Sequence, residues 1–547
     1  MEKKYISENR YKKSFNKKRR NLKDVKNNIN KNATKSVSKK VNKKVVKPQK
    51  TKLNVKRKKK QDSKIRNIVI CIFLLVIIGV ISRAILKDEN EPFIPISFGS
   101  EANKEEIAIG IITEDNLLSE NVSNVVMQEL NNYTKDMIIR VNSDYSIEYN
   151  VVSGIEKKTN TEYILSFDDK YKDAQEKVKN TINSIISNEN SVYYSKVKNI
   201  SDIILQDNGT ILIKLKNSDP YFIYNLNIPI SFDKKSTNSN YIMDESSNNS
   251  KVIYNRNKKA DSSLPARIIV KKYKDMYKAV EAYKLKAINC FVTNADNTEN
   301  IIGKYEYNIM SFRNGKTTFL LLNNKSKLLK SESIRKAVVY GIDRDSIIKS
   351  ILSSKGDIID LPYIYDETKY KYDIYAADNI LLADGYSKVN KVYTKTENYN
   401  SMSIELKLLV NKNDKTNIKI ANKIKKNLES IGIVINIEKL TESNLKKKIS
   451  KSDYDMVLAN VTLNENPDIS FIINNLFITD SIKESISKID ASPILDLKDN
   501  ISNLQNELSN NISIIGIYAD TSYIVYSKDI VGIENISYLN LFKNLFN

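Results

Sequence analysis

The chain has 547 residues, a formal net charge of +23 and no histidine. This length exceeds what one hydrophobic core usually serves, so we expect two or more folded lobes together with non-globular segments. The absence of histidine excludes zinc sites with imidazole ligands and catalytic triads that need an imidazole base. Cys71 and Cys290 lie far apart and form no Cys-x-x-Cys motif, so we expect neither a redox site nor an internal disulfide.

The excess of positive over negative charge is confined to residues 1–66. This segment holds 27 Lys and Arg and 4 Asp and Glu, and the other 481 residues carry 61 charges of each sign. It is also poor in apolar residues, so it cannot offset the entropy of ordering, and we predict a disordered cytoplasmic tail. Two roles stay open for this tail. It can remain in water and only set the orientation of the membrane segment, which we favour slightly, or it can bind anionic lipids of the inner leaflet. Nucleic-acid binding through residues 52–60 is a third, less favoured interpretation.

Residues 68–82 contain no charged residue and are dominated by Ile, Val and Leu. Taken as residues 67–86, the segment would span about 30 Å as a helix, with Arg83 reaching the outer interface. A cleaved signal peptide is the alternative, because Ser82 and Ala84 loosely mimic a small-residue cleavage site. The basic region before it is far longer than in an ordinary signal peptide. We therefore predict a single-pass transmembrane helix with a cytoplasmic N-terminus and an extracellular main domain.

The part of the chain after residue 104 alternates short β-like runs with longer helical patterns, which predicts mixed α/β lobes. Between residues 416 and 431, apolar side chains recur at helical spacing, and Gly432 is placed to end the helix. Strand-like residues 404–410 precede this helix and residues 433–437 follow it. We therefore predict a βαβ unit with two parallel strands over residues 404–437.

Several segments, in collinear order, resemble the extracellular solute-binding proteins of family 5, the peptide- and nickel-binding receptors of ABC importers. The strongest is a trio within residues 317–386: TTFLLLNN, then SESIRKAVVYGIDRDSII, then KYDIYAADNILLADGY after a proline-containing loop. Three further matches are LESIGIVINIE at residues 428–438, DYDMVLA at 453–459 and IIGIYADTSYIVYSKDIVG at 514–532. For the trio itself we expect packing rather than ligand contact, with helix starts capped by Ser331 or Ser333, by Asp343 and by Asp373.

The resemblance implies an α/β, two-lobed fold of the periplasmic-binding-protein type II class, with ligand in the cleft between the lobes. The expected organisation is a tail over 1–66, a transmembrane helix over 67–86, a linker over 87–104, lobe 1 with an inserted subdomain over 105–315, lobe 2 over 316–509, and a return segment over 510–547 that completes lobe 1. Closure of such a clamp around its ligand stabilises the bound state relative to the open one.

Departures from the family pattern fall on the segments that reach the cleft. The family's glycine-rich turn before a tyrosine corresponds here to residues 237–241, which contain no glycine. The best-known peptide receptors hold the ligand's α-amino group with an aspartate about four residues before a proline, but Leu463 stands at that place before Pro467. A buried ammonium needs a carboxylate partner, so Glu465 or Asp468 is the candidate replacement. Tyr241, Glu465 and Asp468 are therefore the predicted ligand contacts.

These observations favour a binding protein over an enzyme, since no phosphate-binding loop, redox pair or catalytic carboxylate constellation stands out. We expect no cofactor and no metal site. The expected partners are an oligopeptide or similar small polar solute and the subunits of an ABC permease. The alternative is a diverged member that has lost ligand binding and serves as a structural or signalling ectodomain. An open polar cavity would favour the receptor, and a filled apolar groove would favour the scaffold.

Overall fold

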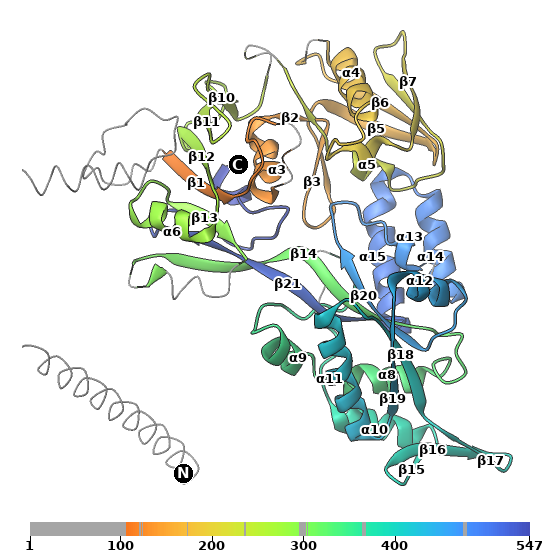
Figure 1. The fold of residues 1–547 in the computed structure, drawn as a ribbon. Coiled ribbons are helices and arrows are strands. Elements are labelled where there is room, and N and C mark those ends of the chain that lie inside the picture. The colour runs from red at the N-terminus through yellow and green to blue at the C-terminus, as the bar shows by residue number, and fades with distance from the viewer. Residues whose placement is uncertain are drawn as a thin grey trace, which may run out of the picture. The chain divides into compact units, whose positions relative to one another are not determined.

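The computed structural model describes residues 106–546, except for 120–121, 123, 172, 233, 235–236, 295–301, 304, 364–367 and 474–478 (Figure 1). The predicted tail, transmembrane helix and linker lie outside these residues. Within the described part of the chain, no helix combines the length and the apolar character that crossing a bilayer requires. The predicted anchor over residues 67–86 therefore stays a prediction.

The largest element is a ten-stranded mixed sheet. Its parallel pairs are β1 with β12 and β13, and β18 with β19 and β20, whereas β14 runs antiparallel to both β20 and β21. This mixture of strands with covering helices confirms the predicted α/β class. In sheet order the strands are β10 (Tyr241–Met243), β11 (Lys251–Arg256), β12 (Arg267–Tyr273), β1 (Glu106–Ile112), β13 (Cys290–Thr293), β21 (Ile514–Tyr526), β14 (Asn308–Leu322), β20 (Met456–Thr462), β18 (Glu405–Asn411) and β19 (Val434–Leu440).

The two longest strands, β14 and β21, lie side by side along the middle of this sheet (Figure 1). The first part of β21 pairs with Thr317–Leu321 of β14, and its last part pairs with both β14 and β13. Between these parts the register shifts at Arg313/Thr317, where Gly315 has a φ of +84°. The irregularity at Gly315 lies directly beside the segment that follows β20, because Leu463 donates its backbone N–H to the Gly315 carbonyl over 2.8 Å.

A separate four-stranded antiparallel sheet has the order β5 (Val152–Thr159), β6 (Glu162–Phe167), β8 (Ile211–Leu215) and β7 (Ile200–Leu205). Helix α4 (Ala174–Ile186) buries Ala174, Val178 and Ile182, which recur at a spacing of four residues. In the chain, the short helix α5 (Tyr194–Val197) precedes β7, and η1 (Phe222–Leu226) follows β8. The same apolar cluster extends to α14 (Asp480–Ala491) and α15 (Ile494–Asn511) through Ile482 and Leu504.

The predicted βαβ unit is confirmed. Strands β18 and β19 are parallel, and α11 (Lys415–Ile431) joins them with Ile420, Ala421, Ile424, Leu428 and Ile431 buried. Ile418, which belongs to the apolar pattern that predicted this helix, is only partly buried. Gly432 ends the helix with a φ of +103°, as the left-handed C-terminal position requires. Local periodicity and one glycine were enough to predict this unit.

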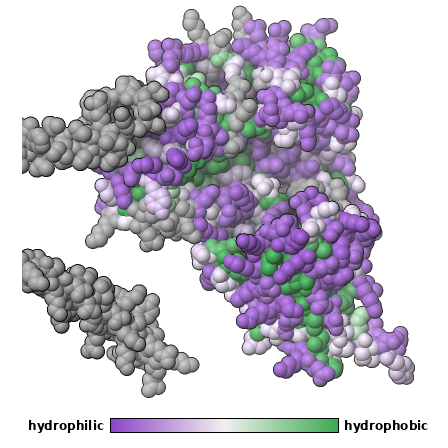
Figure 2. All heavy atoms as spheres, viewed as in Figure 1, coloured by the Kyte–Doolittle hydropathy of each residue, from purple (hydrophilic) through white to green (hydrophobic). Residues whose placement is uncertain are grey.

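The predicted helix starts in the family-like trio are also confirmed. Ser331 caps α8 (Glu332–Gly341), Asp343 caps α9 (Arg344–Ile351) and Asp373 caps α10 (Ile374–Ala383), each by accepting backbone N–H groups of the first turn. Helix α10 leaves Tyr375 and Leu382 exposed. Figure 2 shows hydrophilic side chains predominating on this face of the molecule, with smaller apolar areas between them.

The remaining described elements surround these sheets, and helix α3 packs with the C-terminal residues. Tyr133 of α3 and Phe546 make an edge-to-face ring contact at 5.4 Å, and Phe542 and Phe546 are buried in the cluster that holds Ile109 of β1. The predicted lobe boundaries stay predictions. These elements are α3 (Val125–Thr134), β2 (Asp136–Met137), β3 (Ile139–Val141), β4 (Ile147–Tyr149), β9 (Pro229–Ile230), α6 (Met276–Lys284), β15 (Ser387–Val389), β16 (Val392–Glu397), β17 (Asn400–Ser403), α12 (Glu442–Ser450), α13 (Ser470–Ile473) and α16 (Lys543–Phe546).

Candidate functional site

A polar cavity of about 430 Å³ lies between the segments around α5 and η1 and the loop that follows β20. Lys196 of α5 and Asn225 of η1 contribute polar groups from one direction. The loop contributes Asn464, Glu465, Asn466 and Asp468. A cavity of this size, lined by convergent polar side chains, is suited to a small polar ligand.

The loop after β20 owes its shape to side chains that bond to the backbone two residues further on. Asn464 accepts the N–H of Asn466 over 2.8 Å, and Asn466 accepts the N–H of Asp468 over 2.9 Å. Asp468 accepts the N–H of Ser470 over 2.8 Å. Short side chains of this kind stabilise turns by replacing a backbone acceptor. This succession of turns leaves Glu465 and Asp468 as the two carboxylates that line the cavity.

Glu465 forms an ion pair with Lys196. Only 17% of the Glu465 side chain and 18% of the Lys196 side chain are exposed. Burial by itself raises the pKa of Glu465, but the charge of Lys196 and its hydrogen bond outweigh burial and lower that pKa overall. The next residue, Asn466, donates its side-chain amide to Asn225 over 3.0 Å.

Asp468 is partly buried, and no lysine or arginine among the described residues makes an ion pair with it. Its charge acts on a second carboxylate, Asp219. Burial, with a smaller contribution from the charge of Asp468, raises the pKa of Asp219 to about 6, although a backbone hydrogen bond from Tyr221 lowers it. Asn225 donates to the other Asp219 oxygen over 3.3 Å. Neither carboxylate makes an ion pair with a described lysine or arginine, and two such carboxylates close to one another favour a positively charged ligand group.

The chain contains no tryptophan, and tyrosine supplies the aromatic groups of this region. Tyr193 lines the cavity. Tyr145 makes edge-to-face contacts with Tyr224 at 6.3 Å and with Tyr363 at 6.2 Å, and these three rings are buried. Burial is the main cause that raises the pKa of Tyr363, and the charge of Asp468 adds to it. Tyr145, Tyr224 and Tyr363 therefore pack in the core, whereas Tyr193 lies at the cavity wall.

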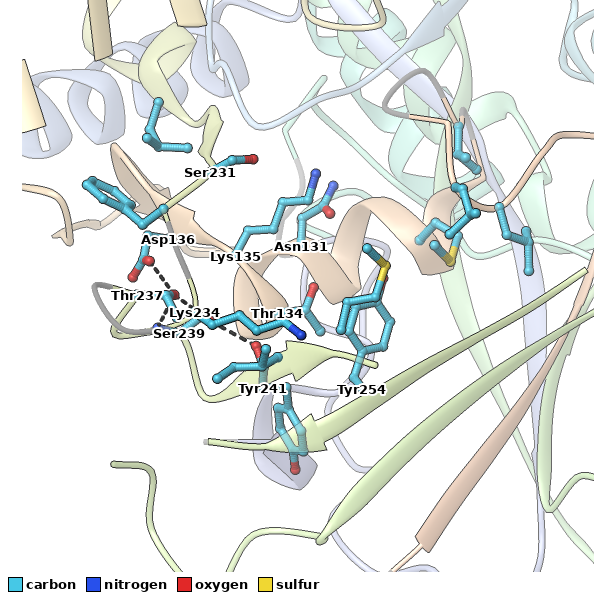
Figure 3. Close-up of a pocket in the computed structure, with 18 of the residues that line it drawn as sticks. Asn131, Thr134, Lys135, Asp136, Ser231, Lys234, Thr237, Ser239, Tyr241 and Tyr254 are labelled. Carbon is cyan, nitrogen blue, oxygen red and sulfur yellow. Dashed lines mark hydrogen bonds between the residues drawn. The ribbon is translucent and has the colours of Figure 1, made fainter. Parts of the chain in front are cut away.

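Tyr241 lies elsewhere, in a second hollow of about 330 Å³ (Figure 3). Its side chain is fully buried, its hydroxyl donates to the Pro265 carbonyl over 3.0 Å, and its ring contacts Phe546 at 5.8 Å. Burial raises the pKa of this hydroxyl. The structure thus brings Glu465 and Asp468 together and places Tyr241 in a packing position, so a ligand contact by Tyr241 has no structural support.

The glycine-free segment before Tyr241 is held by a buried carboxylate. Asp136 accepts hydrogen bonds from the hydroxyls of Thr237 at 2.6 Å and Tyr171 at 2.9 Å and from the Asn238 backbone N–H at 3.2 Å. Ser239 in turn donates to the Tyr241 carbonyl over 2.9 Å (Figure 3). Hydroxyl and backbone donors here stabilise a turn that the family builds from glycine.

Comparison with known proteins identifies the fold that carries this cavity. The family model described as "Bacterial extracellular solute-binding proteins, family 5 Middle" matches residues 174–483, which is more than half of the chain. The chain belongs to this family. The resemblance noted in the sequence is thereby confirmed, and with it a solute-binding domain of the kind that serves ABC importers outside the cytoplasm.

Individual relatives are distant. The probable D,D-dipeptide-binding periplasmic protein DdpA of Escherichia coli K12 is 25% identical over 172 residues, and the match spans only 30% of each chain. A nickel ABC transporter structure from Bacillus halodurans has a TM-score of 0.63 at 15% identity, over 80% of this chain and 98% of that one. The unliganded open form of the murein tripeptide binding protein MppA also scores 0.63, at 14% identity over 81% and 96%. These structural matches show a shared fold.

Reasoning from sequence missed Lys196, Asn225 and Asp219, which lie more than 200 residues before the loop that they approach. The one sequence feature that indicated this site is the loop itself, where Asn464, Asn466 and Asp468 alternate in a pattern typical of turns closed by side chains. Metal binding has no candidate in the described part of the chain, which contains no group of three or more Cys, His, Asp or Glu suited to hold an ion.

Proposed function

We propose that the chain is the ligand receptor of an ABC importer, anchored in the cell membrane by residues 67–86, with its N-terminus in the cytoplasm and its folded part outside. The ligand is an oligopeptide or a similar small polar solute, and the receptor delivers it to the permease subunits. The observation that carries this proposal is the polar cavity beside the Asn464–Asp468 loop, since an open polar cavity is the feature that distinguishes a receptor from a scaffold.

The ligand's ammonium group pairs with Asp468 in this proposal. Asp468 lies three residues after Glu465 on a loop whose turns hold its carboxylate at the cavity wall. A charge-assisted hydrogen bond to a partly buried carboxylate contributes about 1.5–3 kcal/mol to binding. The amides of Asn464 and Asn466 supply donors and acceptors for peptide groups of the ligand.

Peptides are preferred over nickel as the ligand class. The names of the relatives mention D,D-dipeptides, a murein tripeptide and nickel. Asp468 and Asp219 favour an ammonium group, and amide side chains, which are weak ligands for nickel, make up much of the remaining polar lining. The basic tail completes the proposal by keeping the N-terminus in the cytoplasm. Binding to anionic lipids of the inner leaflet, where each basic residue contributes about 1 kcal/mol, is its alternative role.

A second candidate function is a structural or signalling ectodomain without a ligand. Two observations favour it: the ion pair between Lys196 and Glu465 already joins the two sides of the cavity, and one continuous apolar cluster includes both the four-stranded sheet and α14 and α15. Both arrangements hold the protein together without a solute.

Thermal unfolding of the purified full chain in detergent separates the two functions. The panel consists of trialanine, D-alanyl-D-alanine, N-acetyl-trialanine and a nickel–amino acid chelate. A receptor is stabilised by about 2.7 kcal/mol when the free ligand exceeds its Kd a hundredfold. We expect stabilisation by the peptides with a free ammonium and less by the acetylated one. A cooperative transition that none of the four compounds moves would favour the ectodomain.

A further inference from the structure

The Lys196 ammonium occupies a complete binding site of its own. Besides the ion pair with Glu465, its Nζ donates to the Asn227 carbonyl over 2.9 Å and lies 5.6 Å from the centre of the Tyr193 ring. A carboxylate, a carbonyl oxygen and an aromatic face are the three groups that proteins commonly use to bind a ligand's ammonium. The chain thus already places an ammonium against Glu465 at the wall of the proposed ligand cavity.

The same contact ties the loop after β20 to the segment around α5. Glu465 is held by Lys196, and its neighbour Asn466 is held by Asn225 over 3.0 Å. Two consecutive loop residues are therefore bonded to groups more than 200 positions earlier in the sequence. Because both charged side chains are more than four-fifths buried, solvent screens this pair less than a surface ion pair.

We propose that Lys196 is an internal stand-in for the ligand's ammonium: it holds the loop closed through Glu465 when no ligand is bound, and an ammonium-bearing ligand displaces it. This inference rests on the proposed receptor function and names how the same site is regulated. The ligand's ammonium pairs with Asp468, which has no ion pair with a described lysine or arginine, and also with Glu465, which it takes from Lys196.

The exchange selects for cationic ligands because only a cation can replace Lys196 as the partner of Glu465. Breaking the pair without a replacement strands a buried carboxylate, which is strongly unfavourable. Replacing one ammonium by another leaves the carboxylate paired, and the released Lys196 side chain gains water. A neutral solute of the same size cannot make this exchange, so Glu465 stays paired with Lys196 and is not available to it. Lys196 thereby acts as a specificity-determining residue.

The first test needs no ligand. Hydrogen–deuterium exchange of the purified full chain follows the backbone amides of residues 464–468 in the wild type and in Lys196→Met, Lys196→Arg and Glu465→Gln. We expect exchange about tenfold faster in K196M and E465Q and near the wild-type rate in K196R, which keeps the charge. The control is Lys498→Met, which removes the exposed ion pair to Asp144 and should leave this segment unchanged. Wild-type exchange rates in both K196M and E465Q would show that the ion pair does not hold the loop, and would refute the proposal.

The second test separates the stand-in from a merely structural pair. In calorimetric titrations, K196M should bind trialanine about tenfold more tightly than the wild type, because no internal ammonium competes, while E465Q should bind it more weakly. N-acetyl-trialanine, which lacks the ammonium, should show neither difference. Weaker trialanine binding by K196M would overturn the proposal. If no peptide binds any variant, the receptor function fails and the exchange rates alone decide whether Lys196 closes the loop.

Discussion

Glu129 gives the sharpest prediction that the structure allows, because it is an almost fully buried carboxyl group without an ion pair among the described residues. It lies on α3 with 4% of its surface exposed and accepts hydrogen bonds from the Tyr133 hydroxyl over 3.1 Å and from Asn132 over 3.2 Å. Burial raises its pKa from 4.5 to about 8, although these donors, the Phe542 backbone and the charge of Lys543 lower it. At neutral pH the folded chain therefore holds Glu129 largely protonated.

The raised pKa makes the protein less stable as pH rises. Between pH 4.5 and 8 the unfolded chain has released the Glu129 proton while the folded chain still retains it, so each unit of pH lowers the free energy of unfolding. At about 1.4 kcal/mol per unit, the loss from pH 5 to pH 8 is about 3–4 kcal/mol. Above pH 8 both states are ionised and the loss levels off.

Substitution of Glu129 by glutamine tests this reasoning, since glutamine keeps the shape and does not titrate. Urea unfolding of the full chain, followed by circular dichroism from pH 5 to 8.5, should show the wild type losing about 3–4 kcal/mol more than E129Q across this range. The comparison uses the change with pH, so any constant cost of the substitution cancels. Glu281→Gln, at an exposed position on α6, is the matched control and should follow the wild type. Parallel curves for wild type and E129Q would refute the assigned burial effect.

Three further predictions concern other parts of the molecule. Arg344→Met should lower the free energy of unfolding, measured with urea, by about 3–5 kcal/mol, because it leaves the buried Asp360 carboxylate without its ion-pair partner. A loss below about 1 kcal/mol would contradict the role assigned to the pair. Gly315→Ala should lower the free energy of unfolding by about 1–3 kcal/mol, since φ is +84° and the added Cβ would lie 3.0 Å from the Leu463 carbonyl oxygen; an unchanged Tm would argue against this strain. Asp468→Asn should weaken trialanine binding at least tenfold in calorimetry, whereas Asp480→Asn, on the exposed start of α14, should not; equal affinities would remove Asp468 from the site.

The helix caps and the βαβ unit could be predicted because their causes are local. Ser331, Asp343 and Asp373 cap helices by bonding to N–H groups two or three residues ahead, so the cap and its partner lie in the same short window of sequence. Gly432 ends α11 because the residue after the helix needs a left-handed conformation.

The hydrogen-bond partners of the buried Arg335 side chain could not be predicted from the sequence pattern. Packing was predicted for Arg335, and the structure shows that its guanidinium also donates to the carbonyls of Leu329, Lys330 and Asn511. Burial lowers the pKa of Arg335. The third of these acceptors lies 176 residues away. A periodic pattern indicates that a position faces inward, but it does not indicate which distant carbonyl the side chain will reach.

Local periodicity and short matching segments were enough to predict the α/β class, the family and two of the cavity's carboxylates, Glu465 and Asp468. The groups that those carboxylates face depend on contacts between distant parts of the chain. Lys196 stands 269 residues before Glu465 and meets it only because the segment around α5 packs against the loop after β20. Packing in another part of the molecule placed Tyr241 in the core with its hydroxyl already bonded. Charge pairing depends on distances in space, and chain folding, rather than sequence spacing, sets those distances.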